Sequence, residues 1–129
     1  MNDERLPGKI YDGYKVVRIY IDKIDCKEYF MSAFATNAKI MYCENIWVTP
    51  LNNCGPLAVF IAEEPVKQFV GIRTPNDNIM SHAVYKCKYK KSQFAELWVR
   101  TCRVREAMWC GFPIGTDFAD AVMITERII

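Results

Sequence analysis

Gly55-Pro56-Leu57-Ala58-Val59-Phe60-Ile61-Ala62 is the stretch that decides the fold of this chain, because an unbroken apolar run follows a Gly-Pro turn signal. A short apolar run without alternation is typical of a strand that is covered on both faces. Residues 63–65, Glu-Glu-Pro, then suit the first turn of a helix, and an apolar stripe with the i, i+3, i+4 spacing of a buried face follows from Val66. We therefore predict a central strand and, directly after it, a helix over about 63–73.

Segments with strand character flank this centre. Strands are predicted at 14–21, at 28–36, once or twice within 39–49, at 79–89 and at 118–125. The first two are separated by a short polar turn and are expected to pair as a hairpin. The span 94–108 fits both a helical stripe and a β-favouring run, and the strand is preferred. The pattern predicts an α+β fold, a mostly antiparallel twisted sheet of five to seven strands with the helix packed on one face.

Length and composition favour one compact domain over residues 1–129, in which residues 1–12 form a loose lead-in. The chain has 129 residues, of which 51% are hydrophobic and 25% are charged, as in an ordinary globular domain. Its longest apolar stretch is far shorter than the ~20 residues of a membrane-spanning helix, and its first residues lack the layout of a secretion signal. We expect a cytoplasmic protein without a membrane partner.

The six cysteines do not form a recognisable metal or disulfide pattern. No two of them have Cys-x-x-Cys spacing, and His82 is the only histidine. We predict scattered reduced thiols, no bound metal and no cofactor. A disulfide between Cys102 and Cys110, or a metal site assembled from distant cysteines, stays open.

A basic strand face is the first candidate binding site. Lys86, Lys88 and Lys90 alternate along the strand at 79–89 and its end, and Arg103 and Arg105 would share a face if 94–108 is a strand. Lysines beside aromatic rings suit single-stranded nucleic acid, but alternation places Tyr85 and Tyr89 on the other face. Lysines on a strand are also a common protection of a sheet edge, and this interpretation is preferred. The net charge of +2 does not by itself indicate a polyanion partner.

A second candidate site is a trio of polar residues. Arg18, Ser32 and a late glutamate, Glu106 or Glu126, follow one another along the chain in the order Arg, Ser, Glu. This order resembles that of ADP-ribosyltransferase-like folds, and the resemblance implies that the Arg and Ser hold a dinucleotide while the carboxylate stabilises positive charge. The Ser-Thr-Ser run and the Glu-x-Glu pair of those folds are missing here.

The order of several short motifs resembles that of small phage and prophage proteins of unknown activity. These motifs are Gly13-Tyr14-Lys15-Val16-Val17-Arg18, Tyr42 and Trp47, Leu57 to Val70, Cys87-Lys88-Tyr89, and Gly115-Thr116-Asp117-Phe118-Ala119-Asp120-Ala121-Val122. The span from Ser92 to Cys110 departs from this pattern. The resemblance implies a mobile-element origin and supplies no catalytic residues.

The hypotheses on function are ordered mainly by the motifs that are missing from the sequence. It contains no phosphate loop and no nucleophile motif. The preferred hypothesis is a small non-enzymatic domain that binds another macromolecule, most simply a protein, through an exposed sheet face or edge. An anion or nucleic-acid binder and an ADP-ribosyltransferase-like enzyme are the alternatives.

Overall fold

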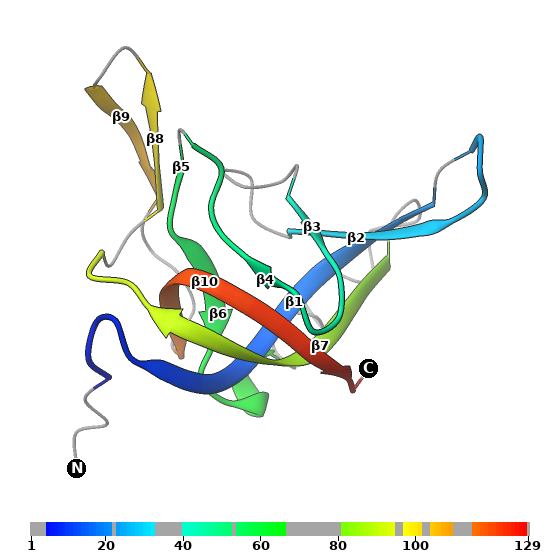
Figure 1. The fold of residues 1–129 in the computed structure, drawn as a ribbon, viewed down its shortest axis with the longest axis horizontal. Coiled ribbons are helices and arrows are strands. Elements are labelled where there is room, and N and C mark those ends of the chain that lie inside the picture. Colours follow the sequence, from blue (N-terminus) through cyan, green and yellow to red (C-terminus); the bar gives the residue numbers. More distant parts are fainter. Residues whose placement is uncertain are drawn as a thin grey trace.

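The computed structural model describes residues 5–21, 23–32, 40–52, 54–66, 81–94, 97–101, 104–109 and 115–128. For Ser32, Ser81 and the segments 97–101 and 104–109 it describes the backbone alone. Ten strands lie in these residues (Figure 1): β1 (Ile10–Ile21), β2 (Glu28–Ser32), β3 (Met41–Tyr42), β4 (Trp47–Val48), β5 (Cys54–Gly55), β6 (Leu57–Phe60), β7 (Ser81–Lys91), β8 (Leu97–Thr101), β9 (Val104–Trp109) and β10 (Thr116–Arg127).

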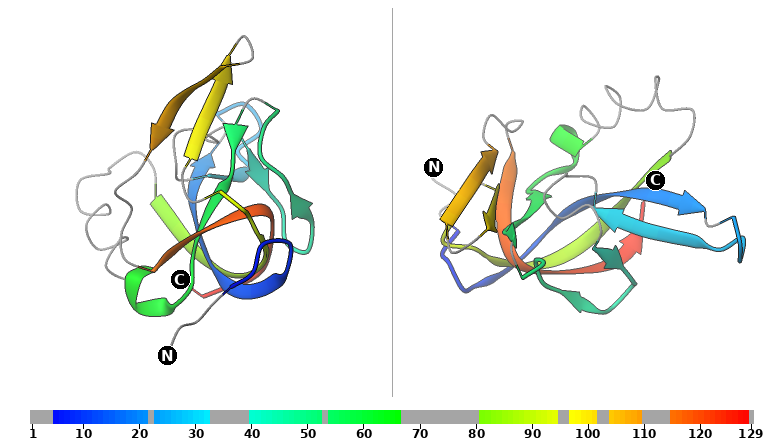
Figure 2. Two further views of the ribbon diagram at one scale, coloured as in Figure 1. Left: turned by 90° about the vertical axis from the view of Figure 1, so that its left-hand side faces the viewer. Right: turned by 90° about the horizontal axis from the view of Figure 1, so that it is seen from above.

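Seven strands form one antiparallel sheet that closes on itself. One edge of β1 pairs with β7, and its other edge pairs with β6 and β2. One edge of β10 likewise pairs with β7, and its other edge pairs with β6 and β4. The strands β1, β7, β10 and β6 therefore make a closed circuit, around which the long strands β1 and β10 curve (Figure 2). Closure leaves none of these four strands as a free edge along its whole length.

The interior of the circuit holds the main core. Side chains from all four circuit strands meet there, among them Val17, Val59, Cys87 and Ile124, each 2% exposed or less. A smaller cluster lies on the outer side: Val16, Phe60, Val66 and Val84. Because β6 sends Val59 to the first cluster and Phe60 to the second, both its faces are buried. The prediction of a central, doubly covered strand at this position is confirmed.

A glycine allows β1 to cross close to β6 and β7. A Cβ atom built on Gly13 would lie 2.8 Å from the Phe60 carbonyl oxygen and 2.9 Å from the Tyr89 ring. Real side chains do not approach so closely, so glycine is required for this approach. Gly13 is thus part of the reason why the circuit can close around bulky tyrosines.

Two expectations from the sequence need correction. The fold is predominantly β rather than clearly α+β, because only residues 63–66 of the expected helix are described as helical, and 67–73 lie outside the described residues. The lead-in is also shorter than predicted, since β1 begins at Ile10 and pairs there with Lys90. The residues around Pro7 and Gly8 do not indicate where β1 begins. Its start is set by pairing with β7, which is distant in the sequence.

The described residues 97–101 and 104–108 of the span 94–108 are strands, as preferred. β8 and β9 pair as an antiparallel hairpin, and β5 adds a third strand beside β8. This small sheet is separate from the seven-stranded one. No helix in the described part of the chain has the length and hydrophobicity needed to cross a bilayer.

Candidate binding surfaces

The three predicted lysines share one exposed face of β7. Lys86, Lys88 and Lys90 are exposed on the outer side of the circuit, whereas Tyr85 and Tyr89 are 2% and 0% exposed in its interior. The predicted separation of lysines from tyrosines is confirmed. The tyrosines are therefore not available to stack on a base beside these lysines.

The interpretation of these lysines as edge protection is wrong. β7 pairs with β1 from Ile19↔Ser81 to Ile10↔Lys90, and with β10 on its other side from Lys91 back to Tyr85. A strand with two paired edges has no open edge to protect. Sequence alternation shows which residues share a face, but it carries no information on how many neighbours a strand has.

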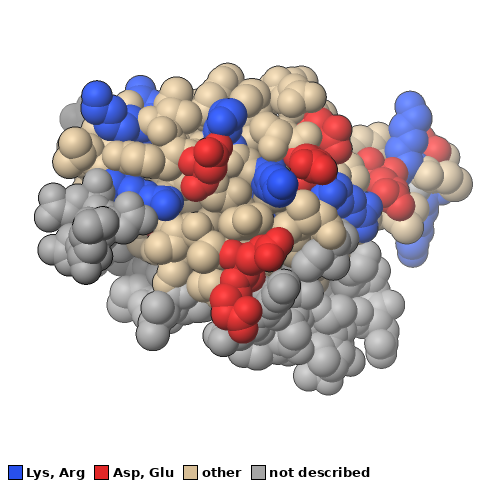
Figure 3. Space-filling view, turned by 90° about the horizontal axis from the view of Figure 1, so that it is seen from below, with Lys and Arg blue, Asp and Glu red and all other residues tan. Residues whose placement is uncertain are grey.

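Carboxylates neutralise two of the three lysines. Lys88 Nζ lies 2.8 Å from Asp12 Oδ1, and Lys86 Nζ lies 3.7 Å from Glu126 Oε2. Lys90 makes no ion pair with any residue that the structure describes. Figure 3 shows Lys and Arg interspersed with Asp and Glu on this side of the molecule. The face is of mixed charge, which is a poor match for a polyanion.

Only the three lysines are described on this face. Arg103 lies outside the described residues, and Arg105 lies on β9, opposite Arg100 in the three-stranded sheet. The lysines belong to the seven-stranded sheet. Arg105 is therefore on a different sheet from the lysines.

The polar trio also fails to meet in one cleft. Arg18 is the register partner of Met31 and His82, and Ser32 is the partner of Val17. Glu126 is the partner of Lys86, on the far side of β7 and four residues further along it. Two strand spacings and four residues separate the Cα atoms of Arg18 and Glu126 by roughly 16 Å, beyond the reach of one small ligand. The alternative glutamate, Glu106, lies on β9, in the other sheet.

An exposed apolar segment is the candidate that the sequence did not single out. Four large apolar side chains point outward from residues 41–51: Met41, Ile46, Trp47 and Leu51, exposed to 53%, 56%, 43% and 40%. The segment is fixed by Tyr42 and Val48, which face the core, and by the Asn45 amide, which donates to the Ile124 carbonyl at 2.8 Å. We call residues 41–51 the apolar segment.

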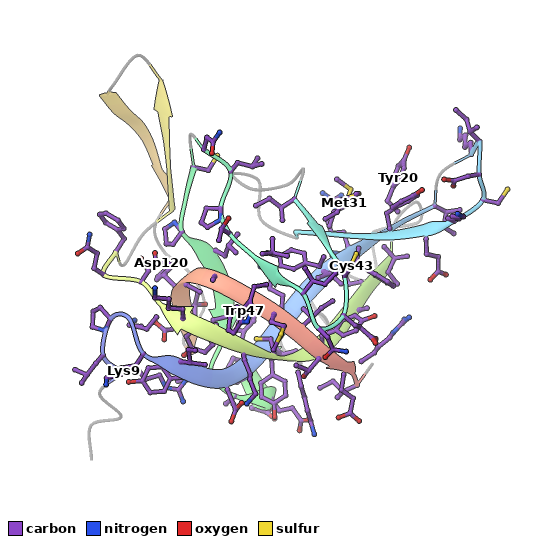
Figure 4. The ribbon with its side chains drawn as sticks, viewed as in Figure 1. Lys9, Tyr20, Met31, Cys43, Trp47 and Asp120 are labelled. Atoms are coloured by element: carbon purple, nitrogen blue, oxygen red, sulfur yellow. The ribbon has the colours of Figure 1, made fainter. Side chains whose placement is uncertain are left out.

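Neighbouring strands widen this surface. Trp47 is the register partner of Met123 on β10, and Met41 is the partner of Met31 on β2. Side chains of antiparallel partners stand on the same face of a sheet and touch. Figure 4 shows Trp47 beside β10 and Met31 beside β2. Large exposed apolar side chains that gather in a patch are typical of interaction sites.

A pocket of about 350 Å³ opens between β2 and β3, next to this surface. Its lining is apolar and aromatic except for two carboxylates: Glu28, Tyr29, Phe30, Met41, Tyr42, Cys43 and Glu44. The pKa of the nearby Tyr85 is raised, first by burial and then by the charge of Glu44, with Glu28 adding to it and Arg127 opposing it. The pocket thus combines an apolar wall with negative charge.

Lys15 is a buried cation that the sequence reading did not single out. Its side chain is 1% exposed, and its Nζ donates to the Ala58 carbonyl at 2.7 Å and lies 5.3 Å from the centroid of the Tyr42 ring. Burial lowers the pKa of Lys15 to about 8, with the nearby Cys87 opposing this shift. The alternation along β1 could have indicated this burial, because Lys15 lies on the same inward face as Val17 and Ile19. The contacts tie β1 to β6 and β3 inside the circuit.

The described cysteines Cys26, Cys43, Cys54 and Cys87 are free thiols, whereas Cys102 and Cys110 lie outside the described residues. The described part of the chain contains no group of three His, Cys, Asp or Glu side chains that could hold a metal ion. No protein-family model, characterised protein or solved structure matches the chain. The resemblance to phage proteins therefore stays a prediction.

Proposed function

We propose that this chain is a non-enzymatic protein-binding domain and that the apolar segment is its docking surface. One observation carries the proposal: four large apolar side chains are 40–56% exposed within residues 41–51, beside an apolar pocket that holds two carboxylates. Holding large apolar groups in water is unfavourable by roughly 25 cal/mol per Å² of exposed apolar area. A partner that covers them recovers this free energy.

The pocket indicates the chemistry of the partner. A side chain with an apolar stem and a cationic head fits it, because the stem contacts Phe30 and Met41 while the head lies near Glu28 or Glu44. We infer a partner segment that combines bulky apolar residues with Lys or Arg. β3 and β4 are two residues long each, so side-chain docking contributes more here than addition of a strand.

Selection from a random peptide library on the immobilised protein tests this proposal. We expect the enriched peptides to combine apolar residues with Lys or Arg and to bind the double variant Met41→Ala/Trp47→Ala at least ~10-fold more weakly, as loss of central apolar anchors predicts. Ile10→Ala is the matched control, because Ile10 is 58% exposed but lies on β1.

Three results would contradict the proposal. The enriched peptides could be acidic, they could bind the double variant as tightly as the unmodified chain, or they could lose affinity with Ile10→Ala instead. The double variant Glu28→Gln/Glu44→Gln separates the contribution of the carboxylates from that of the apolar contacts. It should weaken the binding of basic peptides and leave the binding of purely apolar peptides unchanged.

An anion or nucleic-acid binder is the second candidate. One observation favours it: Trp47 lies on the same outer face as Lys88. Met123 of β10 is the register partner of both residues. This candidate is disfavoured by the ion pairs of Lys86 and Lys88. Titration of a fluorescent single-stranded oligonucleotide at two salt concentrations distinguishes this candidate from the protein-binding domain. Affinity that depends on contacts between lysines and phosphates falls steeply as the salt concentration rises. We expect weak binding without that dependence.

A further inference from the structure

An aromatic and acidic cluster lies at the entrance of β1 into the circuit and uses none of the residues of the apolar segment. Tyr11 of β1 and Tyr89 of β7 face each other with ring centroids 6.1 Å apart. The Arg5 guanidinium carbon lies 5.3 Å from the Tyr11 centroid and 5.9 Å from the Tyr89 centroid. Arg5 therefore occupies a cage made by two aromatic rings, within the distance at which a cation is attracted to a ring.

A hydrogen-bond chain continues from the cage to a buried carboxylate. Arg5 Nη1 donates to Tyr89 Oη at 2.6 Å, and Tyr89 Oη donates to Asp117 Oδ2 at 2.7 Å. The other oxygen, Asp117 Oδ1, accepts from the Phe118 amide at 2.9 Å and from Lys91 Nζ. Burial, followed by the bond to Asp117, raises the pKa of Tyr89, so its phenol stays neutral and its oxygen can accept from a guanidinium.

The cage is built by the circuit and not by Arg5. Tyr11, Tyr89 and Asp117 lie on β1, β7 and β10, and Tyr89 and Asp117 are 0% and 7% exposed. Arg5 precedes β1, on a segment held by the Leu6 amide, which donates to Tyr11 Oη at 2.7 Å, and by the Gly8 amide, which donates to the Lys91 carbonyl at 2.8 Å. Departure of the Arg5 side chain removes none of the strand contacts that position the cage.

Two pockets adjoin Arg5. Pockets of about 290 Å³ and about 630 Å³ are both lined by Arg5 and Ile61. Thr116, Asp117 and Lys91 line the smaller pocket, and Lys88 and Asp12 line the larger one. The Arg5 side chain therefore borders two hollows that a ligand could enter.

We propose that this cage is a binding site for the guanidinium group of an arginine side chain, and that Arg5 is its resident occupant. The cage offers what a guanidinium needs, namely two aromatic rings within cation–π distance, a phenol oxygen to accept an N–H, and a carboxylate behind it. Arg5 occupies it at an effective concentration of the order of millimolar, so a free arginine ligand must compete with it. A compact, strongly hydrated ammonium is the poorer ligand because it loses more hydration in the cage and lacks the planar fork of N–H donors.

Titration of Arg5→Ala with methylguanidinium chloride tests the site, with the Tyr ring resonances followed by NMR. We expect saturable shifts in the variant and at least ~2-fold weaker binding to the unmodified chain, since Arg5 competes there. Methylammonium should bind the variant more weakly than methylguanidinium. Adding Tyr89→Phe to Arg5→Ala should weaken methylguanidinium binding, because the accepting oxygen is removed. Lys9→Ala is the matched control, since Lys9 is an exposed cation on the same segment and should behave as the unmodified chain does.

Several outcomes would overturn the proposal. They are equal binding to both chains, no saturable binding to Arg5→Ala, and no preference for guanidinium over ammonium. Inorganic phosphate shifting the unmodified chain but not Arg5→Ala would assign the cluster to anions through Arg5 and Lys91 instead. Arg5→Met, which keeps the apolar stem without the charge, repeats the titration if Arg5→Ala does not fold.

Discussion

At the scale of single residues, Lys15 and Gly13 show how the circuit accommodates groups that a β core usually excludes. Lys15 keeps a hydrogen bond to Ala58 and a ring contact with Tyr42, which partly compensate for the lost hydration of its ammonium group. Gly13 supplies space where Phe60 and Tyr89 come close. Both residues lie on β1, and both have consequences for stability that can be measured.

Lys15 makes stability depend on pH. Its pKa is about 8 in the folded protein against 10.5 for an ordinary lysine, so the unfolded chain binds more protons between these values and stability rises with pH. We expect urea denaturation to show a gain of roughly 1 kcal/mol from about pH 7.5 to about pH 9, and Lys15→Met to abolish it. Above about pH 9 the gain should level off, because burial raises the pKa of Cys87 from 9.0 to about 12 and acts in the opposite direction. The same rise in Lys15→Met would contradict this account.

Gly13→Ala should destabilise the fold by about 1–3 kcal/mol, because its methyl group would overlap the Phe60 carbonyl and the Tyr89 ring. The free energy of unfolding in urea measures the effect. Asp12→Ala is a neighbouring control that loses only the exposed pair with Lys88, for which we expect a change within about 1 kcal/mol. Equal stability of the two variants would mean that β1 does not cross β6 this closely.

At the scale of elements, the sequence predicted strands well and their neighbours poorly. The alternation along β7 correctly placed Tyr85 and Tyr89 on the face opposite to Lys86 and Lys88, because a period of two is a local property. The pairing of β7 with both β1 and β10 joins segments far apart in the chain, so the edge interpretation of Lys86 and Lys88 had no local signal against it. The apolar segment was missed for a related reason. An exposed Trp47 and a half-buried Val48 look alike in a sequence until their partners are known.

The central position of β6 predicts a large effect of truncation. Leu57 is 1% exposed on β6, and Leu57→Ala should cost about 2–5 kcal/mol, because it removes buried methyl groups and leaves a cavity. Leu51→Ala is the comparison, since Leu51 is 40% exposed, and it should cost less than about 1 kcal/mol. Urea denaturation of both variants gives the two values. Similar costs would show that β6 is not enclosed.

At the scale of the whole molecule, closure places Lys15 and the two tyrosines of the cage on the interior side of the circuit, whereas the exposed side chains of the apolar segment lie on its outer side. The sequence predicted the antiparallel sheet and the hydrophobic centre at Val59. It did not predict the closed circuit, which depends on β6 bridging β1 and β10, nor the cage at Arg5, which needs residues from three strands to meet. Each proposed site uses a pairing made by a circuit strand, because β10 places Met123 beside Trp47 and β7 places Tyr89 beside Tyr11.

Backbone NOE measurements on the isotope-labelled protein test the closure most directly. Phe60 is the register partner of Tyr14 on β1 and of Thr116 on β10. The account predicts cross-strand NOEs from Phe60 to both residues in the same sample. NOEs from Phe60 to only one of the two strands would show an open sheet and would contradict the closed circuit.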